Sequence, residues 1–409
     1  MTTEAGLSRL IARNLPRRIM EVIADGGGEA RLVGGVVRDV LNGADPEAAT
    51  DFDIAVNLPP ETCMALLEKG GFHVIPTGIA HGTVTVVDHK RGGVRAEVTS
   101  LRADIRTDGR HAEVVFGTDW LEDARRRDFT INTMYLSATG EVFDPFDGRV
   151  DLAAGKVRFV GDAETRITED YLRMLRFFRF HARFGGAVPD ADAMAAIRQH
   201  AEGLSRISGE RIAQEMRGIL TASSPGAIMH MVTTGLDRMI AAGGFNTQGF
   251  DRLAPFMPKL TPMHCLGFLL RGQGHEAPAA RLRLSRKENA VLRLAANPDP
   301  YAPLADENWA AVAYELTRDG AITPPLLAGL YAVAAADTGD VDASVFDRLC
   351  QWQRPHLPIG GDDLTARGVT PGRELGRLLH RLEQHWIASG FSAGRDELMK
   401  ILDADEMNG

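Results

Sequence analysis

The sequence predicts an α+β fold, with a small mixed β-sheet and helices in the N-terminal part and only helices after it. Two observations lead to this prediction. The first third of the chain alternates short apolar or Val- and Thr-rich runs with helical segments, whereas the pattern from about Thr168 onward is almost wholly helical. A length of 409 residues exceeds what one compact core usually serves, so several domains are expected.

Four strands are recognisable in the first third. Ala30–Val33 is apolar and runs into a pair of glycines, and Asp51–Val56 alternates polar and apolar residues as a half-buried strand does. Thr83–Val87 and Val94–Leu101 are rich in Val and Thr, which favour strands. The segment Asp144–Gly148 is rich in turn residues, and we place the end of the sheet domain just after it, near residue 150.

The helical part is interrupted most clearly at Asn297–Pro300 and at Gly360-Gly361. Its longest apolar stretch, around Pro324 to Ala336, is too short to span a bilayer and is interpreted as a buried helix. We find no tandem repeats and no low-complexity segment.

The composition is typical of a soluble globular protein, with 44% hydrophobic and 25% charged residues. The formal net charge of −9 argues mildly against nucleic-acid binding, but arginines are locally dense and could line a basic groove. Cys63, Cys265 and Cys350 lie far apart without a CxxC pair, which fits a reducing compartment and excludes a disulfide scaffold. Without an apolar leader at the N-terminus, we expect a cytoplasmic protein that makes no use of a membrane.

The first chemical pattern is Asp51-Phe52-Asp53. On a strand, residues i and i+2 face the same side, so both carboxylates could meet one or two divalent ions while Phe52 packs behind them. Mg²⁺ prefers a few carboxylates together with substrate phosphates, and such ions assist phosphoryl transfer. Taken alone, this pattern is more often two solvated acids on an edge strand.

The glycine pair Gly34-Gly35 adds a second pattern. Glycines at the end of a strand allow bare backbone N–H groups to approach an anion, and the helix expected to follow adds its positive end. Arg38 lies in that helix and could reach a triphosphate. The chain contains no Walker motif, so the alternative is an ordinary strand–helix turn.

Together, these patterns and three more resemble the class II tRNA nucleotidyltransferase and bacterial poly(A) polymerase family of the DNA polymerase beta superfamily. The motifs occur in the family's order: LVGGVVRD at residues 32–39, DFD at 51–53, RRDFTIN at 126–132, EDYLRMLR at 169–176 and SGERI at 208–212. The resemblance covers roughly residues 30 to 220. Beyond it, the helical remainder fits the family in length more than in motif.

The resemblance implies four domains. They are a catalytic nucleotidyltransferase head at residues 1–150, a helical neck for base recognition at 151–225, a helical body at 226–340 and a helical, tRNA-binding tail at 341–409. The implied reaction is attack of the tRNA 3′-hydroxyl on the α-phosphate of CTP or ATP, with release of pyrophosphate and without a nucleic-acid template. The sequence leaves the oligomeric state open.

The resemblance also implies roles for individual residues. Asp51 and Asp53 match the Mg²⁺ ligands, and Glu97 lies where the superfamily often has a third catalytic carboxylate. The residues that match nucleotide-binding positions are Gly34, Gly35, Arg38, Arg126, Arg127, Asp128, Asp170, Arg173, Arg176 and Arg179.

Base choice is expected from two residues of the neck. Asp170 and Arg173 are three apart on a helix that we expect to begin near Thr168, so they should be neighbours on its surface. An ionised Asp accepts and an Arg donates, which matches the amino donor and ring-nitrogen acceptor shared by cytosine and adenine. Uracil and guanine present the opposite pattern and would be rejected.

Three alternatives to a full CCA-adding enzyme remain. Bacterial poly(A) polymerases usually carry a basic run with Phe-Arg-Leu after the catalytic strand, where this chain has Thr77–Val86 instead. Enzymes that add only CC tend to lack the flexible segment that Arg102–Val115 provides here, with a turn at Asp108-Gly109, whereas an A-only enzyme stays open. A non-catalytic RNA-binding relative is disfavoured by the intact Asp51, Asp53 and Arg127.

Overall fold

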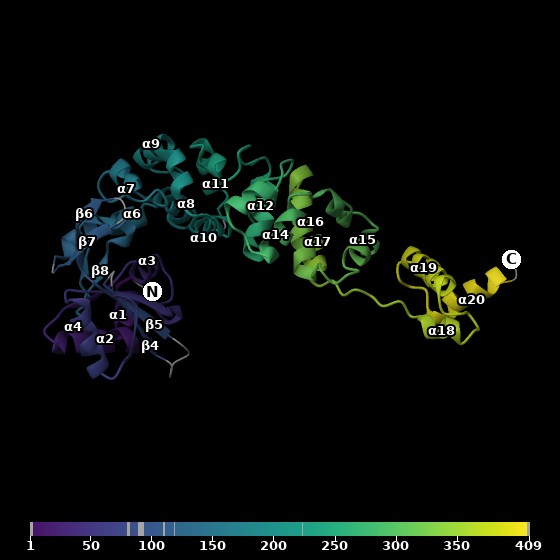
Figure 1. Cartoon of the computed structure of the whole chain (residues 1–409), viewed down its shortest axis with the longest axis horizontal. Coiled ribbons are helices and arrows are strands. Elements are labelled where there is room, and N and C mark those ends of the chain that lie inside the picture. Colours follow the sequence, from purple (N-terminus) through teal and green to yellow (C-terminus); the bar gives the residue numbers. More distant parts are fainter. Residues whose placement is uncertain are drawn as a thin grey trace. The chain divides into compact units, whose positions relative to one another are not determined.

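The computed structural model describes residues 3–79, 82–88, 94–108, 111–117, 119–222 and 224–406. Figure 1 shows the chain with its sheet in the N-terminal part and helices in the rest. The chain divides into two compact units, one made of Met1–Ile219 and Gly226–Met239 and the other of Leu220–Pro225 and Ile240–Gly409. The finer boundaries near residues 150, 225 and 340 stay predictions.

The first unit is built on a sheet with the strand order β3-β4-β5-β2-β1-β8-β9. Its strands are β1 (Ala30–Val33), β2 (Asp51–Val56), β3 (His73–Gly78), β4 (Thr83–Asp88), β5 (Val94–Ser100), β8 (Tyr135–Leu136) and β9 (Val142–Phe143). β2 pairs with β5 in parallel, whereas the other neighbouring pairs are antiparallel. The expected mixed sheet is therefore confirmed.

Helices surround this sheet and continue beyond it within the same unit. They are α1 (Thr3–Ala12), α2 (Asn14–Asp25), α3 (Gly35–Leu41), α4 (Pro60–Lys69), α5 (Trp120–Arg125), α6 (Gly148–Ala153), α7 (Ala163–Glu169), α8 (Arg173–Phe184), α9 (Ala191–His200), α10 (Gly209–Leu220) and α11 (Gly226–Thr233). In α2, Leu15, Ile19 and Ile23 recur every fourth residue and are buried, which gives one apolar face that packs on β1 and β2.

Helices also make up the second unit. They are α12 (Pro262–Leu269), α13 (Glu276–Arg281), α14 (Arg286–Ala295), α15 (Trp309–Leu316), α16 (Pro324–Thr338), α17 (Ala343–Cys350), α18 (Gly361–Thr365), α19 (Arg373–Ala388) and α20 (Arg395–Glu406). Short 3-10 helices in the two units are η1 (Pro46–Ala48), η4 (Thr130–Asn132), η5 (Ala201–Arg206), η6 (Leu236–Met239), η7 (Phe250–Leu253), η8 (Met257–Lys259) and η9 (Asp299–Ala305).

The predicted buried helix is α16, most of which has no exposed surface. The last three helices form a separate hydrophobic cluster around Leu364, Leu382, Trp386 and Leu398, which Tyr314 of α15 joins. No helix among the described residues is both long and apolar enough to cross a membrane.

The sequence located some elements closely and missed others. β1 and β2 have the predicted bounds, but the wholly helical part follows β9 and begins with α6, well before Thr168. The carboxylate of Asp144 accepts hydrogen bonds from the backbone N–H groups of Gly148 and Arg149 and thereby starts α6 inside the turn-rich segment.

The segment Arg102–Val115, for which the sequence predicted flexibility, is a β-hairpin in its described part, and its flexibility stays a prediction. β6 (Arg102–Asp108) and β7 (His111–Phe116) pair antiparallel, and Asp108 lies opposite His111. Residues 109 and 110 at its turn, and residues 80 and 81 of the Thr77–Val86 motif, lie outside the described residues.

One buried histidine makes the stability of the second unit depend on pH. The backbone N–H of Thr261, at the N-terminus of α12, donates to Nδ1 of His264 at 3.1 Å. His264 is 2% exposed and lies against Gly329 of α16, where a Cβ atom would come within 2.5 Å of the ring. Burial lowers the pKa of His264 to about 4, so the ring is neutral at physiological pH.

We predict that the stability falls as the pH falls from about 7 to about 4. The unfolded chain binds a proton at His264 near pH 6.5, whereas the folded chain does not. The free energy of unfolding therefore decreases by up to about 3 kcal/mol. His264→Asn keeps an acceptor for Thr261 and cannot titrate. Urea midpoints at pH 7.5 and pH 5 should differ less for this variant than for the wild type or for the exposed His380→Asn control. Equal differences in all three proteins would contradict the assignment.

Candidate active site

The two carboxylates of β2 lie on one exposed face of the sheet. Asp51 and Asp53 are exposed on either side of Phe52, which is buried behind them. The parallel register places Glu97 of β5 opposite Asp53 and Arg95 opposite Asp51. Glu97 is therefore beside the Asp-x-Asp pair, at the position where the sequence suggested a third carboxylate.

These acids repel one another. Although Asp53 is exposed, the protein atoms around its carboxylate partly desolvate it, which raises its pKa first, and the charges of Glu97 and Asp51 raise it further, while Arg127 and Arg38 act in the opposite direction. Asp51 forms a hydrogen-bonded ion pair with Arg95, a residue that sequence reasoning missed. The face therefore carries excess negative charge that a bound cation would neutralise.

The Gly34-Gly35 turn lies directly against this face. Gly34 has φ 72° and ψ −130° and precedes α3, a backbone conformation that favours glycine. A Cβ atom at Gly34 would be 3.4 Å from Oδ2 of Asp53 and 3.8 Å from Nη1 of Arg127. The turn, a carboxylate and an arginine thus converge at one point.

Arg38, which the sequence suggested could reach a triphosphate, is a buried residue. Its side chain donates to Asp39 and, at 2.6 Å, to Oδ1 of Asn132, and its guanidinium lies over the rings of Phe184 and Phe180. Only 5% of Arg38 is exposed, and burial lowers its pKa. These contacts join α3 to η4 and α8.

The arginine run after α5 is mostly anchored. Arg125 is exposed, as a solvated turn would be, but Arg126 and Arg127 both pair with Asp123, which is only 1% exposed. Arg127 also donates from Nε to the hydroxyl of Tyr135 at 2.9 Å. The sequence indicated neither Asp123 nor Tyr135 as a site residue.

Asp128 begins a buried network of alternating charges. Its Oδ2 accepts from Nε of Arg176 at 2.7 Å, and its Oδ1 accepts from the side chain of Asn132 at 3.0 Å. Glu215 of α10 lies 3.8 Å from Nη1 of Arg176 and 2.8 Å from Nε of Arg179. Arg176 and Arg179 of α8 therefore connect this helix to the segment after α5 and to α10. Glu215 was another residue that the sequence left unmarked.

The expectation that Asp170 and Arg173 share a helix is wrong. α7 ends at Glu169, Asp170 has an extended backbone, and α8 begins only at Arg173. The helix is interrupted because the Asp170 carboxylate accepts from the backbone N–H of Leu172, a local bond that competes with helix formation. Thr168 lies in the last turn of α7 and does not cap α8.

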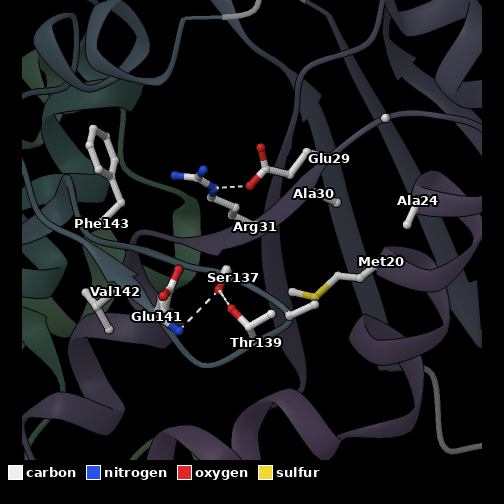
Figure 2. A pocket seen from close by; sticks show the side chains of 12 residues that line it. Met20, Ala24, Glu29, Ala30, Arg31, Ser137, Thr139, Glu141, Val142 and Phe143 are labelled. Carbon is white, nitrogen blue, oxygen red and sulfur yellow. Dashed lines mark hydrogen bonds and ion pairs between the residues drawn. The ribbon is translucent and has the colours of Figure 1, made fainter.

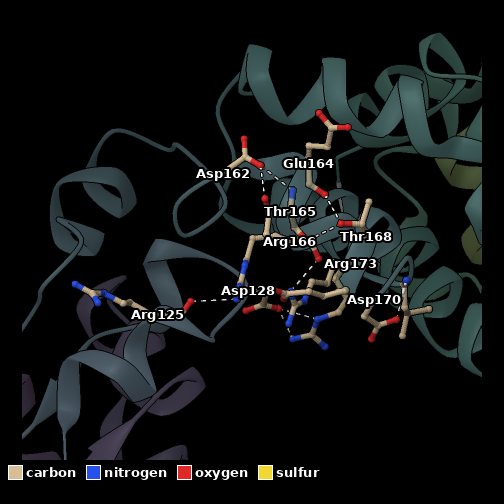
Figure 3. Close-up of polar contacts among 12 residues, drawn as sticks. Arg125, Asp128, Asp162, Glu164, Thr165, Arg166, Thr168, Asp170 and Arg173 are labelled. Atoms are coloured by element: carbon tan, nitrogen blue, oxygen red, sulfur yellow. Dashed lines mark hydrogen bonds and ion pairs between the residues drawn. The ribbon is translucent and has the colours of Figure 1, made fainter. Parts of the chain in front are cut away.

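Both residues of this junction have protein partners. Asp170 pairs with Arg211 of α10 at 2.7 Å, while Arg173 pairs with Glu169 and donates to the carbonyl of Arg166 at 2.8 Å. Figure 3 shows Arg166 between Arg173 and Arg125, to whose backbone carbonyl the Arg166 side chain donates a hydrogen bond at 3.1 Å. The junction is thereby connected to the segment that carries Arg126 to Asp128.

A separate hollow of about 780 Å³ lies elsewhere in the first unit. Figure 2 shows its lining, in which Arg31 pairs with Glu29 and polar groups of the β8–β9 turn face the space. It adjoins Ala30 at the start of β1, whereas Gly34 follows the end of that strand. None of the predicted site residues lines it, so we do not assign it to the candidate active site.

Comparison with known families matches two parts of the chain. Residues 30–158 match the poly A polymerase head domain, and residues 189–240 match a domain described as a probable RNA and SrmB-binding site of polymerase A. The first match contains the glycine turn, β2, β5 and the arginine run.

Two relatives match nearly the whole chain. The mitochondrial CCA tRNA nucleotidyltransferase 1 of Mus musculus is 35% identical over 397 residues, which cover 94% of this chain and 89% of the relative. The CCA-adding enzyme of Leuconostoc citreum is 41% identical over 396 residues, which cover 93% of this chain and 94% of the relative.

Solved structures of CCA-adding enzymes are also similar to this chain. The Bacillus stearothermophilus CCA-adding enzyme in complex with CTP is similar with a TM-score of 0.68 and 28% identity, covering 96% of this chain and 98% of that one. The Thermotoga maritima CCA-adding enzyme complexed with tRNA has a TM-score of 0.72 at 19% identity, covering 98% of each chain, which shows a shared fold.

We predict that Asp128→Asn destabilises the first unit by about 3 kcal/mol, because it removes the charge hydrogen-bonded to Arg176 and leaves only the Glu215 carboxylate 3.8 Å away. Asp162→Asn is the matched control, since Asn at the start of α7 can still accept the N–H of Thr165. Urea unfolding of both variants and the wild type gives the comparison. Equal midpoints for Asp128→Asn and the control would show that the ion pair contributes little.

Proposed function

The chain belongs to the family of CCA-adding tRNA nucleotidyltransferases, and we propose that it adds CCA to the 3′ end of tRNA from CTP and ATP. The observation that carries this proposal is the convergence of Asp53, Gly34 and Arg127 at one point, with Asp51 and Glu97 beside it. A transferring triphosphate needs such an arrangement, with acids for a cation and with backbone N–H groups and arginine for phosphates.

The donor set at β2 fits Mg²⁺. No three acidic, histidine or cysteine side chains among the described residues are grouped closely enough to enclose a metal ion. Mg²⁺, however, needs only one or two carboxylates when phosphates supply the other oxygens. We therefore propose Asp51 and Asp53 as the ligands, with Glu97 as a third catalytic carboxylate. When bound, the ion lowers the pKa of the attacking hydroxyl and neutralises phosphate charge.

The remaining groups bind and orient the nucleotide. We propose that backbone N–H groups at Gly34-Gly35 and the guanidinium of Arg127 contact the triphosphate. Arg126 and Asp128, with Arg176 and Arg179, complete the nucleotide site. Arg38 is proposed as a further triphosphate contact, since its Nη2 lies 3.6 Å from the position of a Cβ atom at Gly35 and its bonds to Asp39 and Asn132 use only part of its donors. The 3′-hydroxyl of tRNA attacks the α-phosphate and pyrophosphate leaves.

Base choice is proposed to reside at the α7–α8 junction. Asp170 and Arg173 are half-buried at the junction, and both are paired with protein groups. Arg211, the partner of Asp170, is half exposed, so the amino group of cytosine or adenine can take its place on the carboxylate. Arg173 would then donate to the ring nitrogen, as the sequence suggested for a different backbone geometry.

We propose full CCA addition rather than a partial or poly(A) reaction. In the sequence, the β6–β7 hairpin follows β5, which carries Glu97, and precedes α5, which carries Asp123. It occupies the segment that CC-only enzymes tend to lack. An adjustable element there would let one pocket accept cytosine and then adenine.

The tRNA is proposed to bind through its backbone and shape, because one enzyme must accept all tRNA sequences. The region from α9 to α11, which matches the RNA-binding family model, is one proposed contact. A cytoplasmic location stays a prediction, and the mouse relative named above is mitochondrial.

We predict that Asp51→Asn and Asp53→Asn each abolish incorporation of CTP and ATP into tRNA, because each removes a proposed Mg²⁺ ligand. Asp53→Asn should not lower the thermal midpoint of the metal-free protein, since it relieves repulsion from Glu97 and Asp51. The exposed Asp45→Asn is the matched control and should be fully active. Near-normal turnover of either β2 variant with Mg²⁺ would refute the metal assignment.

For base choice, we predict that Asp170→Asn lowers the ratio of kcat/KM for CTP to kcat/KM for UTP by about 5-fold to 150-fold, since one mismatched polar contact costs about 1–3 kcal/mol. Glu164→Gln on α7 makes the same change of carboxylate to amide away from the junction and should keep the wild-type ratio. All four nucleotides are compared on truncated tRNA. Unchanged discrimination in Asp170→Asn would exclude this carboxylate as a base contact.

A further inference from the structure

Among the described residues, Arg127 is hydrogen-bonded along one edge of its guanidinium, and its guanidinium carbon lies 5.2 Å from the centroid of the Tyr135 ring. Its Nε and Nη2 both point to Oδ2 of Asp123, at 3.3 Å and 3.2 Å, and Nε also donates to the hydroxyl of Tyr135 at 2.9 Å. The third nitrogen, Nη1, faces Gly34 and Asp53 instead. Arg127 therefore has an anchored edge and an edge directed at the proposed triphosphate site.

The two oxygens of Asp123 serve different arginines. Oδ1 accepts from Nε and Nη2 of Arg126, whereas Oδ2 accepts from Arg127 and, at 2.7 Å, from the hydroxyl of Tyr135. Burial alone would raise the pKa of Asp123, but the charges of Arg127 and Arg126 and the bond from Tyr135 outweigh it and lower the pKa. Asp123 therefore remains ionised although it is almost fully buried.

Tyr135 connects this arrangement to the glycine turn. It lies in β8 opposite Val33, the last residue of β1, and Gly34 follows immediately. The ring is fully buried and packs edge-on against Trp120 at 5.5 Å between ring centroids. The hydroxyl is thus fixed by the sheet, so the direction of Arg127 is set from the same strand end that forms the turn.

We propose that Asp123 and Tyr135 are positioning residues that orient Arg127 toward the nucleotide, and we call this pair the Asp123–Tyr135 clamp. The inference rests on the proposed function, in which Arg127 contacts the nucleotide. A guanidinium whose orientation is fixed before binding loses less freedom when the nucleotide arrives, so the clamp favours nucleotide binding. It acts equally on the bound substrate and on the transition state, and therefore on KM more than on kcat.

Tyr135→Phe tests this without disturbing Arg126, because it removes only the hydroxyl shared by Arg127 and Oδ2 of Asp123. We expect KM for CTP and ATP to rise about fivefold while kcat changes less than twofold. Tyr331→Phe is the control, since it removes another buried hydroxyl, which accepts from the backbone of Asp342 in the second unit. This control should keep the wild-type KM, and circular dichroism verifies the fold of each variant.

The decisive comparison repeats Tyr135→Phe in an Arg127→Met background, as a double-mutant cycle. If Tyr135 acts through Arg127, the substitution no longer changes KM there. Additive effects, or an unchanged KM for Tyr135→Phe while Arg127→Met raises it, would overturn the clamp and leave the proposed function intact. A wild-type KM and turnover for Arg127→Met would instead overturn the role of Arg127 itself, and the clamp with it.

Discussion

The buried ion pair between Asp128 and Arg176 is the contact on which the arrangement of the candidate site depends. It joins the segment after α5 to the arginine-bearing face of α8. The same carboxylate accepts from Asn132, which in turn accepts from Arg38 of α3. Asp128 therefore connects the arginine run to α8 directly and to the helix after the glycine turn through Asn132 and Arg38. The Asp128 carboxylate is almost fully buried, so a fold that left it without an oppositely charged partner would be much less stable. The pairing with Arg176 therefore favours this one arrangement of the segments.

The same principle explains how a protein with a net charge of −9 can form a site for a triphosphate. Arginines of the candidate site form ion pairs with buried acids inside the protein. These pairs are Arg127 with Asp123, Arg176 with Asp128 and Arg179 with Glu215. Their charges are used inside the protein, so the net charge says little about the surface that meets the substrate. Arg127 shows the consequence most clearly, since one edge is neutralised by Asp123 while the other faces Asp53 and Gly34. Local geometry, not composition, decides the polarity of the site.

The sequence predicted the elements whose pattern is local. β2 alternates polar and apolar residues, so its bounds and its acidic face could be read directly. The break between α7 and α8 could not, because it depends on one side-chain bond from Asp170 to Leu172 that competes with a helical pattern. Asp123 and Tyr135 were missed for another reason: their partners are set by tertiary contacts, and a buried acid has no signature in the sequence.

We propose that this single site adds C, C and A in that order without a nucleic-acid template. It is tested most directly by incubating the purified chain and Mg²⁺ with tRNA lacking its last three nucleotides, in a mixture of all four nucleoside triphosphates, and sequencing the product ends. The expected products are tRNAs extended by CCA alone, with no added uridine or guanosine. Ends that stop after CC, that stay unextended, or that grow into a run of A would show that this chain does not carry out the full addition.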